Sequence, residues 1–162
     1  MSPVPTPSQT VGPFYSIGLD RTPANVLVDP DAPEALRVAG RLVDGVGAPV
    51  SDGLIEIWSA TAGAWGRCGT ADDGSFWFVL AKPPAVPGEA PRYDLLVFAR
   101  GLLRHQLTRL YFPDEVEANA ADPVLGALPD ADRASLVAEQ ADGGLRFEVR
   151  MQGERQTVFF AQ

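Results

Sequence analysis

The chain has 162 residues, of which 46% are hydrophobic and 21% charged, values typical of a single globular domain with its own core. Thirteen lysines and arginines against 21 aspartates and glutamates leave a formal net charge of −8, so neither nucleic acid nor an anionic membrane is an expected partner. No apolar run reaches the roughly 18 residues of a membrane helix, no signal-peptide pattern opens the chain, and a single cysteine forms no internal disulfide, so a cytoplasmic protein is expected.

Residues 1–35 differ from the rest of the chain. They contain seven prolines and show no apolar periodicity, which predicts an extended N-terminal arm rather than a packed element. The remaining residues, 36–162, are expected to form one domain.

That domain is rich in strand-forming residues. Seven segments combine β-branched and aromatic residues or period-two alternation with flanking turn residues. They are Ala35–Val43, Gly53–Ser59, Ser75–Ala81, Asp94–Ala99, Leu107–Phe112, Leu145–Met151 and Thr157–Phe160. One short helix is predicted over Asp130–Gln140, with Asp130 or Asp132 as its N-cap. The pattern predicts a mainly β protein, folded as a two-layer β-sandwich.

Few residues of the chain could carry chemistry of their own. His105 and Cys68 are its only histidine and cysteine, too few for the ligand sets of zinc or mononuclear iron sites. The acidic residues at 72–73 and at 130 and 132 lack the spacing of a calcium loop and are typical of turns and helix caps. The sequence contains neither a Gly-x-Ser-x-Gly nucleophile motif nor a phosphate-binding glycine loop. From its own side chains we expect no catalytic residue and no metal site.

Six stretches of the chain nevertheless resemble, in the same order, the intradiol ring-cleaving dioxygenases. They are TPSQTVGPFY, GRLVDGVGAPVSDGLIEIWSA, GRCGTADDGSFWFVLAKP, FARGLLRHQLTRLYFPDE, NAADPVL and QGERQTVFF. The strings FARG and TRLYF, with QGE followed by TVFF, are similar to the alpha subunit of the two-subunit members, which carries no iron. The resemblance implies a β-sandwich of the intradiol dioxygenase type.

The resemblance also implies an activity for the two-subunit assembly. It is the cleavage of protocatechuate by O₂ between its two hydroxyls, giving 3-carboxy-cis,cis-muconate in the β-ketoadipate pathway of aromatic degradation.

Members of this family hold Fe(III) with two tyrosinates and two histidines, hard ligands that keep the iron ferric. By the resemblance, the four ligand positions fall on Trp65, Val86, Arg92 and Asp94, which do not form such a set. The resemblance therefore implies that this chain binds no cofactor and that Fe(III) lies in a partner beta subunit. The isolated chain is expected to be inactive.

What this chain would contribute is one wall of the partner's pocket. By the resemblance, the residues of that wall are Thr10, Gly12 and Pro13 in the arm, and Arg100 in FARG. A guanidinium can bind the ring carboxylate of protocatechuate at the alpha–beta interface through charge-assisted hydrogen bonds. The alternative for these residues is that Arg100 pairs with an acidic residue and that Gly12-Pro13 only turns the arm.

The expected partner is the beta subunit, with the proline-rich arm lying against it, and the pairs are expected to assemble into a higher-order symmetric hetero-oligomer. A different class of function stays open. The stretch DGVGAPVSDGLIEIW also resembles transthyretin-like β-sandwiches, which would make the chain a non-enzymatic binding or scaffold module. A single-chain dioxygenase with divergent ligands is a third possibility.

Overall fold

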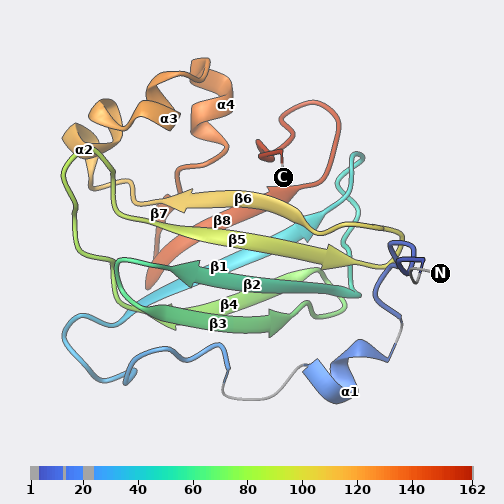
Figure 1. Ribbon diagram of the computed structural model, residues 1–162. Helices are drawn as coiled ribbons and strands as arrows, with labels where there is room; N and C mark the ends of the chain where they lie inside the picture. Colours follow the sequence, from blue (N-terminus) through green and yellow to red (C-terminus); the bar gives the residue numbers. More distant parts are fainter. Residues whose placement is uncertain (1–3, 13, 20–23, 162) are drawn as a thin grey trace.

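The computed structural model describes residues 4–12, 14–19 and 24–161, and it shows two four-stranded sheets packed face to face (Figure 1). The strand order is β4-β1-β8-β7 in one sheet and β3-β2-β5-β6 in the other. The strands are β1 Leu36–Val43, β2 Gly53–Ser59, β3 Ala64–Gly69, β4 Ser75–Leu80, β5 Arg92–Ala99, β6 Gln106–Tyr111, β7 Glu139–Ala141 and β8 Gly144–Arg150. Neighbouring strands are antiparallel except β1 and β8, which are parallel. The predicted two-layer β-sandwich is confirmed.

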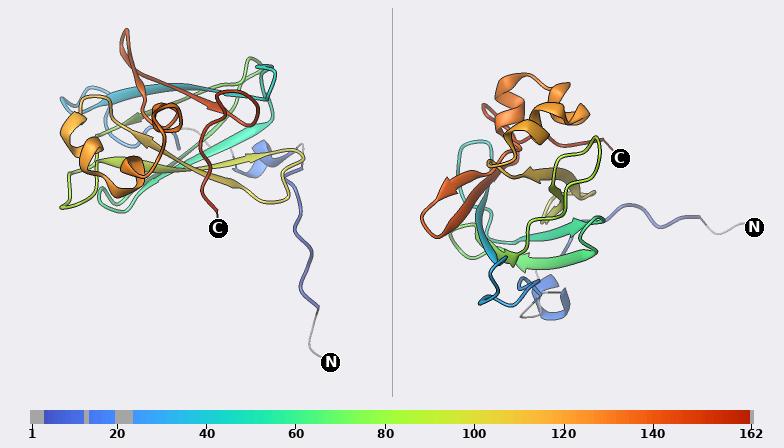
Figure 2. Two further views of the ribbon diagram at one scale, coloured as in Figure 1. Left: turned by 90° about the horizontal axis from the view of Figure 1, so that it is seen from above. Right: turned by 90° about the vertical axis from the view of Figure 1, so that its left-hand side faces the viewer.

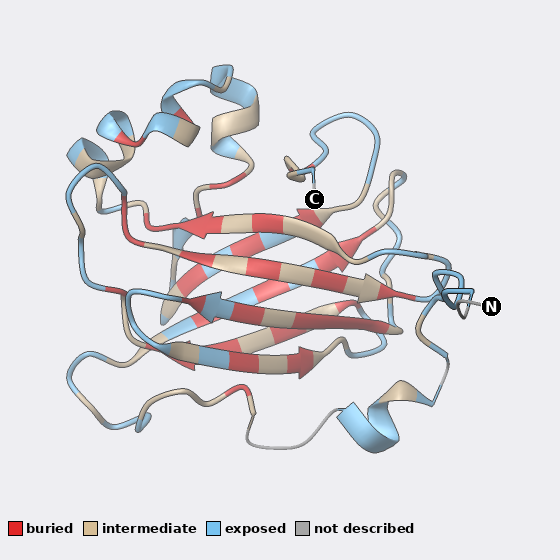
Figure 3. Cartoon of the chain, viewed as in Figure 1, coloured by how far each residue is buried: buried red, intermediate tan, exposed pale blue. Residues whose placement is uncertain are grey.

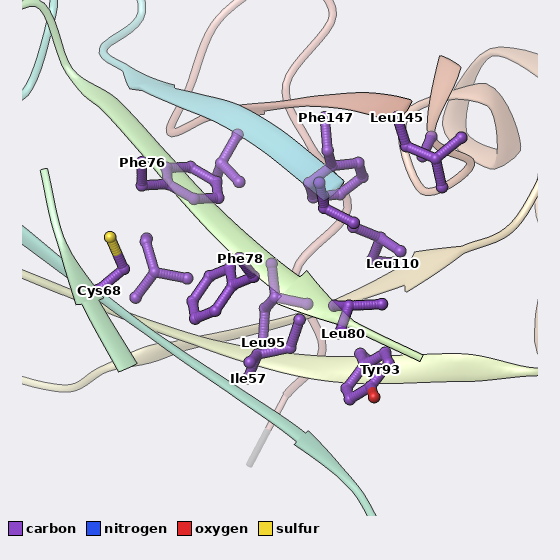
Figure 4. Packing of buried hydrophobic residues seen from close by; sticks show 14 of the residues in the cluster. Ile57, Cys68, Phe76, Phe78, Leu80, Tyr93, Leu95, Leu110, Leu145 and Phe147 are labelled. Atoms are coloured by element: carbon purple, nitrogen blue, oxygen red, sulfur yellow. The ribbon is translucent and has the colours of Figure 1, made fainter. Parts of the chain in front are cut away.

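The core lies between the two sheets. Buried and less buried residues alternate along β5, as expected for a strand with one face on a core (Figure 3). Phe78 and Phe147 from one sheet pack in the same apolar cluster as Ile57 and Leu95 from the other (Figure 4). Cys68 is buried in this cluster too, where a thiol behaves as a small apolar side chain.

The helical content differs from the prediction of one short helix. The described residues form four: α1 Tyr15–Leu19, α2 Val116–Ala121, α3 Pro123–Gly126 and α4 Asp130–Ala134. The helix predicted over Asp130–Gln140 is wrong beyond Ala134, because the chain there pairs with the end of β6. The amide of Tyr111 donates to the carbonyl of Leu136 (2.9 Å), and the amide of Ala138 donates to that of Tyr111 (3.0 Å). No helix in the described part of the chain has the length and hydropathy needed to cross a membrane.

The strand predictions fail at three places. β3 and β7 were not predicted, since β3 carries two glycines and β7 has only three residues. The strand predicted over Thr157–Phe160 is wrong, because this segment makes only an isolated bridge, in which the Phe160 amide donates to the Leu107 carbonyl at 2.8 Å.

The described parts of the N-terminal arm, predicted to be extended, take three forms: an extended segment, the helix α1 and a segment packed on the sandwich. Residues 4–12 form an extended segment whose N-terminal end runs away from the sandwich (Figure 2), while Thr10 forms hydrogen bonds with the backbone of Ala99 and Gly101. In contrast, Asn25 and Leu27 lie against β4, where both form backbone hydrogen bonds with Val79 (2.9 and 2.8 Å). The later part of the arm is therefore packed on the sandwich, and the domain boundary at residue 35 stays a prediction.

Candidate functional site

The candidate residue Arg100 directly follows β5, at the end of the sandwich that Thr10 of the arm contacts. Figure 1 shows the arm beside this end of β5. Ala99 to Leu102 form a β-turn, in which the Leu102 amide donates to the Ala99 carbonyl at 3.1 Å. Gly101 occupies the third position of this turn with φ of +93°, a conformation that favours glycine. The turn leaves the Arg100 side chain 69% exposed. The guanidinium is thus accessible to a substrate or a partner at this end of the sandwich.

Thr10 binds the backbone on both sides of Arg100. Its hydroxyl donates to the carbonyl of Ala99 (3.2 Å) and accepts from the amide of Gly101 (2.8 Å). Two of the residues predicted for the site, about 90 positions apart in sequence, are therefore adjacent in the fold.

Gly12 lies further along the same arm and is exposed. A Cβ atom added there would meet no atom within 4 Å, so the position borders open space. Its carbonyl accepts from the Tyr15 amide (3.2 Å), and the Tyr15 hydroxyl donates to the carbonyl of Gly53 (2.6 Å) at the start of β2. Pro13 lies outside the described residues.

The charge of Arg100 is partly balanced within the chain. Its Nε lies 3.0 Å from Oδ2 of Asp52, which directly precedes β2. The two residues meet because Gly53 and Ala99 are opposite each other in the β2–β5 pairing. The alternative in which Arg100 pairs with an acidic residue thus describes a contact that exists in this chain.

A cavity of about 220 Å³ lies beside these residues and was not predicted. It is lined by Gln9, Val11, Phe98, Leu102, Leu103, Arg104 and His105. The His105 ring packs against Phe98 with ring centroids 5.2 Å apart, which gives the only histidine a packing role. The juxtaposition of arm and turn creates this hollow, and nothing in the local sequence indicates it.

The four positions that match iron ligands do not meet at one point. Trp65 lies opposite Trp58 in the β2–β3 hairpin, where the Arg67 guanidinium stacks over its ring at 4.9 Å. Val86, Arg92 and Asp94 do come together, around a cavity of about 60 Å³. Trp65 is not among the residues lining this cavity, which are Trp58, Ser59, Ala60, Thr61, Pro84, Val86, Glu89, Ala90, Arg92 and Asp94.

Ion pairs occupy the charged groups at this cavity. Arg92 Nη1 lies 2.7 Å from Glu89 Oε2, and Asp94 Oδ1 lies 3.1 Å from Arg109 Nε. Burial acts to lower the pKa of Arg92, but the hydrogen bond to Glu89 and nearby negative charge outweigh it and raise the pKa. A guanidinium held in this charged state cannot donate an electron pair to a metal and repels a cation.

Tyr93 on β5 and Tyr111 on β6 are not among the residues that line this cavity. Burial raises the pKa of Tyr111 despite the hydrogen bond from Arg109, and it raises the pKa of Tyr93 to about 12. The Tyr93 hydroxyl donates to the Ala81 carbonyl (3.0 Å). Within the described residues no group of three or more His, Cys, Asp or Glu side chains could hold a metal ion. The residues at the family's ligand positions therefore do not fit iron.

A larger cavity, of about 590 Å³, lies on the other sheet beside α4 and β8. Four of its charged residues form pairs, Arg146 with Glu139 (2.6 Å) and Arg150 with Glu148 (2.9 Å). Neither histidine nor cysteine is among the described residues that line it. Its two hydroxyls bond to the backbone and not to a side-chain base: Ser135 donates to the Asp132 carbonyl (2.7 Å), and Thr157 accepts from the Arg150 amide (2.9 Å).

Similar proteins decide between the families that the sequence left open. The chain is 40% identical to the protocatechuate 3,4-dioxygenase alpha chain of Burkholderia cepacia, over 96% of both chains. It is 37% identical to the alpha chain of Pseudomonas putida, over 96% of this chain and 95% of that one. The chain belongs to the family of protocatechuate 3,4-dioxygenase alpha chains. No family model matches it.

More distant relatives agree with this family. The protocatechuate 3,4-dioxygenase beta chain of Burkholderia cepacia is 30% identical over 64% of this chain and 55% of its own length. Among solved structures, the dioxygenase domain of a dioxygenase–carbohydrate-binding fusion from Streptomyces sp. SirexAA-E aligns with a TM-score of 0.57 and 26% identity, covering 91% of this chain and 96% of that one. The sandwich is therefore that of the intradiol dioxygenases and not of a transthyretin-like module.

The alignments with the alpha chains extend over 190 and 191 positions, more than the 162 residues present here. These alpha chains therefore carry extra residues within the aligned range. In this chain, the connection from β2 to β3 is only the four residues Ala60 to Gly63. So tight a hairpin explains why Trp65 lies opposite Trp58 and not at the small cavity.

Proposed function

We propose that this chain is the alpha subunit of a protocatechuate 3,4-dioxygenase. With an iron-carrying beta subunit it would cleave protocatechuate between its two hydroxyls with O₂, giving 3-carboxy-cis,cis-muconate. The observation that carries the proposal is the similarity to two alpha chains over 96% of the sequence. The ion-paired residues at the ligand positions support a division of labour in which the partner supplies the metal.

In this proposal, Fe(III) of the beta subunit binds the catecholate and activates it toward O₂. The residues of this chain bind and orient the substrate. Arg100 is suited to the ring carboxylate, because an exposed guanidinium offers paired donors in a planar fork. A local cation is needed, since the net charge of −8 otherwise repels an anionic substrate.

Thr10 and Gly12 have different roles in the proposal. The Thr10 hydroxyl uses its donor and an acceptor on the turn around Arg100, so it holds the arm and the turn together. Gly12, followed by Pro13 in sequence, would form a pocket wall without bulk, and the open space around the Gly12 α-carbon is consistent with that.

The proposed partner is the beta subunit, in an alpha–beta hetero-oligomer with higher-order symmetry. The arm carries apolar side chains that this chain does not cover: Phe14 is 75% exposed and Ile17, on α1, is 80% exposed. Exposed apolar side chains on a short helix and directly before it are typical of a surface that a partner covers. The proposed location is the cytoplasm, which suits a chain with a single buried thiol.

Co-expression with the beta subunit tests the proposal. We expect a stable complex with the brick-red colour of tyrosinate-bound Fe(III) that consumes O₂ and protocatechuate. The isolated chain, prepared in the same medium, is expected to bind no stoichiometric iron and to be inactive. A red, iron-loaded isolated chain would show that the ligands are in this subunit. Failure to form any complex with the beta subunit would instead favour an independent binding module.

A further inference from the structure

The ion pair between Asp52 and Arg100 leaves part of the guanidinium free. Asp52 contacts the Nε side, at 3.0 Å. Arg100 donates no hydrogen bond to any residue that the structure describes, so its two Nη atoms have no acceptor there. A carboxylate binds most strongly to a guanidinium through two parallel N–H donors. The edge formed by the Nη atoms is thus available for a second carboxylate while Asp52 stays in place.

We propose that Asp52 is a positioning residue, which holds the Nε edge of Arg100 so that its Nη edge faces the ring carboxylate of the substrate. This inference rests on the proposed function and adds a specificity-determining residue to it. Asp52 itself does not touch the substrate.

The backbone next to Asp52 is well fixed. The Gly53 amide donates to Thr70 Oγ1 (2.9 Å), and its carbonyl accepts from the Thr70 amide (2.9 Å) and from the Tyr15 hydroxyl (2.6 Å). There is also no room beside Gly53, since an added Cβ would lie 2.4 Å from Leu42 Cδ2. Asp52 therefore projects from a well-fixed point directly before β2.

The carboxylate has few other partners. Its side chain is 29% exposed, and Oδ2 is buried without a hydrogen bond to any described residue. Arg100 is the cation that lies against this oxygen. A buried charged oxygen without hydrogen bonds is costly unless a cation stays close, so Asp52 favours conformations in which Arg100 lies against it.

Without the ion pair to Asp52, little would fix the conformation of the Arg100 side chain. It is a long side chain on a turn, and at 69% exposure little of the chain packs against it. Without Asp52 the guanidinium would have to be ordered each time a substrate binds, and ordering one such side chain weakens binding by about 2- to 10-fold. With Asp52 in place, much of that ordering precedes binding.

The opposite role is also physically reasonable: Asp52 could compete with the substrate carboxylate for Arg100. The two roles predict opposite signs. Removal of a positioning residue weakens the binding of protocatechuate, whereas removal of a competitor strengthens it. In either role catechol, which lacks the carboxylate, is unaffected.

The test uses the complete alpha–beta complex with Asp52→Ala, Asp52→Asn, Arg100→Ala and the double variant. We expect Asp52→Ala to raise the KM for protocatechuate by about 2- to 10-fold with little change in kcat, and to leave the KM for catechol unchanged. Asp52→Asn keeps the shape of the side chain but removes the charge of the ion pair, so its effect should approach that of Asp52→Ala. The double variant should be no worse than Arg100→Ala, since Asp52 acts through Arg100.

An equilibrium measurement avoids dependence on turnover. The dissociation constant of 4-hydroxybenzoate should rise in Asp52→Ala relative to that of phenol. Asp142→Ala is the matched control, because it removes an exposed carboxylate, outside β7 and β8, that pairs with no described residue.

The outcomes separate this inference from the proposed function. If Arg100→Ala lowers the preference for protocatechuate and Asp52→Ala and Asp52→Asn do not, Asp52 has no positioning role and the proposed function stands. Tighter binding of protocatechuate in Asp52→Ala would identify Asp52 as a competitor and overturn the inference. If Arg100→Ala itself affects both substrates equally, the carboxylate role of Arg100 and the role of Asp52 both fail.

Discussion

Asp94 and Arg109 lie opposite each other on β5 and β6, with Oδ1 of the carboxylate 3.1 Å from Nε of the guanidinium. Asp94 occupies one of the positions that match an iron ligand, and its charge is balanced by a cation of the same chain. Arg109 also contacts the Tyr111 hydroxyl (3.3 Å) and stacks over the Phe160 ring at 4.9 Å. The ion pair therefore joins the two strands to the C-terminal segment.

Arg109→Ala should destabilise the isolated chain. The variant removes the stacking on Phe160 and leaves Asp94 partly buried without its closest cation, which is expected to lower the free energy of unfolding by about 1 to 3 kcal/mol. Urea unfolding measures the change. Arg146→Ala is the control, since its pair with Glu139 is largely exposed and should contribute less than about 1 kcal/mol. Equal losses in the free energy of unfolding would show that the Asp94–Arg109 pair stabilises the fold no more than the exposed Arg146–Glu139 pair does.

Arg100→Ala tests the carboxylate role directly. In the alpha–beta complex we expect the KM for protocatechuate to rise by about 10- to 100-fold, as for the loss of a charge-assisted hydrogen bond, while the KM for catechol changes little. Arg100→Lys keeps the charge without the planar fork and should recover only part of the loss. Steady-state kinetics on both substrates distinguish this from a general disturbance of the pocket, which would raise both KM values together.

How far the sequence predicts this fold depends on the element. Alternation and β-forming residues were sufficient for β2 and β5, because one face of each strand packs on the core. β3 was missed because its glycine at position 66 weakens the strand pattern. That glycine is needed, since a Cβ there would lie 2.5 Å from Leu27 Cδ1 and 2.9 Å from the Ala24 carbonyl. Contacts of this kind come from tertiary packing, which local patterns do not contain.

The candidate site also depends on tertiary contacts that local sequence patterns do not contain. Thr10 and Arg100 were predicted from the resemblance alone, and Asp52 was not predicted at all. Their proximity depends on the register of β2 against β5, in which Gly53 is opposite Ala99. An aspartate directly before one strand and an arginine directly after its antiparallel neighbour would have indicated the pair, had that register been known.

Thr10→Val should release the arm from the turn around Arg100. Valine keeps the shape of the side chain but neither donates to Ala99 nor accepts from Gly101. Limited chymotrypsin digestion of the isolated chain should then cut faster at Phe14 and Tyr15, because cleavage follows local opening. Thr10→Ser keeps the hydroxyl and serves as the control. Unchanged digestion of Thr10→Val would mean that other contacts hold the arm.

Tyr93 should make the fold sensitive to alkaline pH. Its side chain is 1% exposed, and burial raises the pKa to about 12 from the ordinary value of 10.0. The unfolded chain loses this proton near pH 10 and the folded chain does not. The stabilisation from the neutral phenol is therefore complete below pH 10 and is lost as the pH rises toward 12, by about 2 to 3 kcal/mol in total.

The measurement is the free energy of unfolding in urea between pH 8 and pH 11.5. Tyr93→Phe loses the hydrogen bond to Ala81 and should be less stable at pH 8, by about 1 kcal/mol, but its stability should fall less steeply above pH 10. A residual slope from Tyr111, whose pKa burial also raises, is expected in both proteins. Parallel curves for the two proteins would contradict the assignment to Tyr93.

Ile17 should be needed for assembly and not for folding. It lies on α1 with 80% of its side chain exposed, so this chain gains little from burying it. In a complex that covers α1, a charge at this position would be buried without a partner, which is strongly unfavourable. Ile17→Asp is expected to reduce co-purification with the beta subunit by at least about 10-fold while the urea midpoint of the isolated chain stays unchanged.

Ser16→Asp adds the same charge at the neighbouring exposed position of α1 and controls for electrostatic repulsion alone. Loss of the complex in both variants would point to charge rather than to an apolar contact, and full assembly of Ile17→Asp would place the interface away from α1.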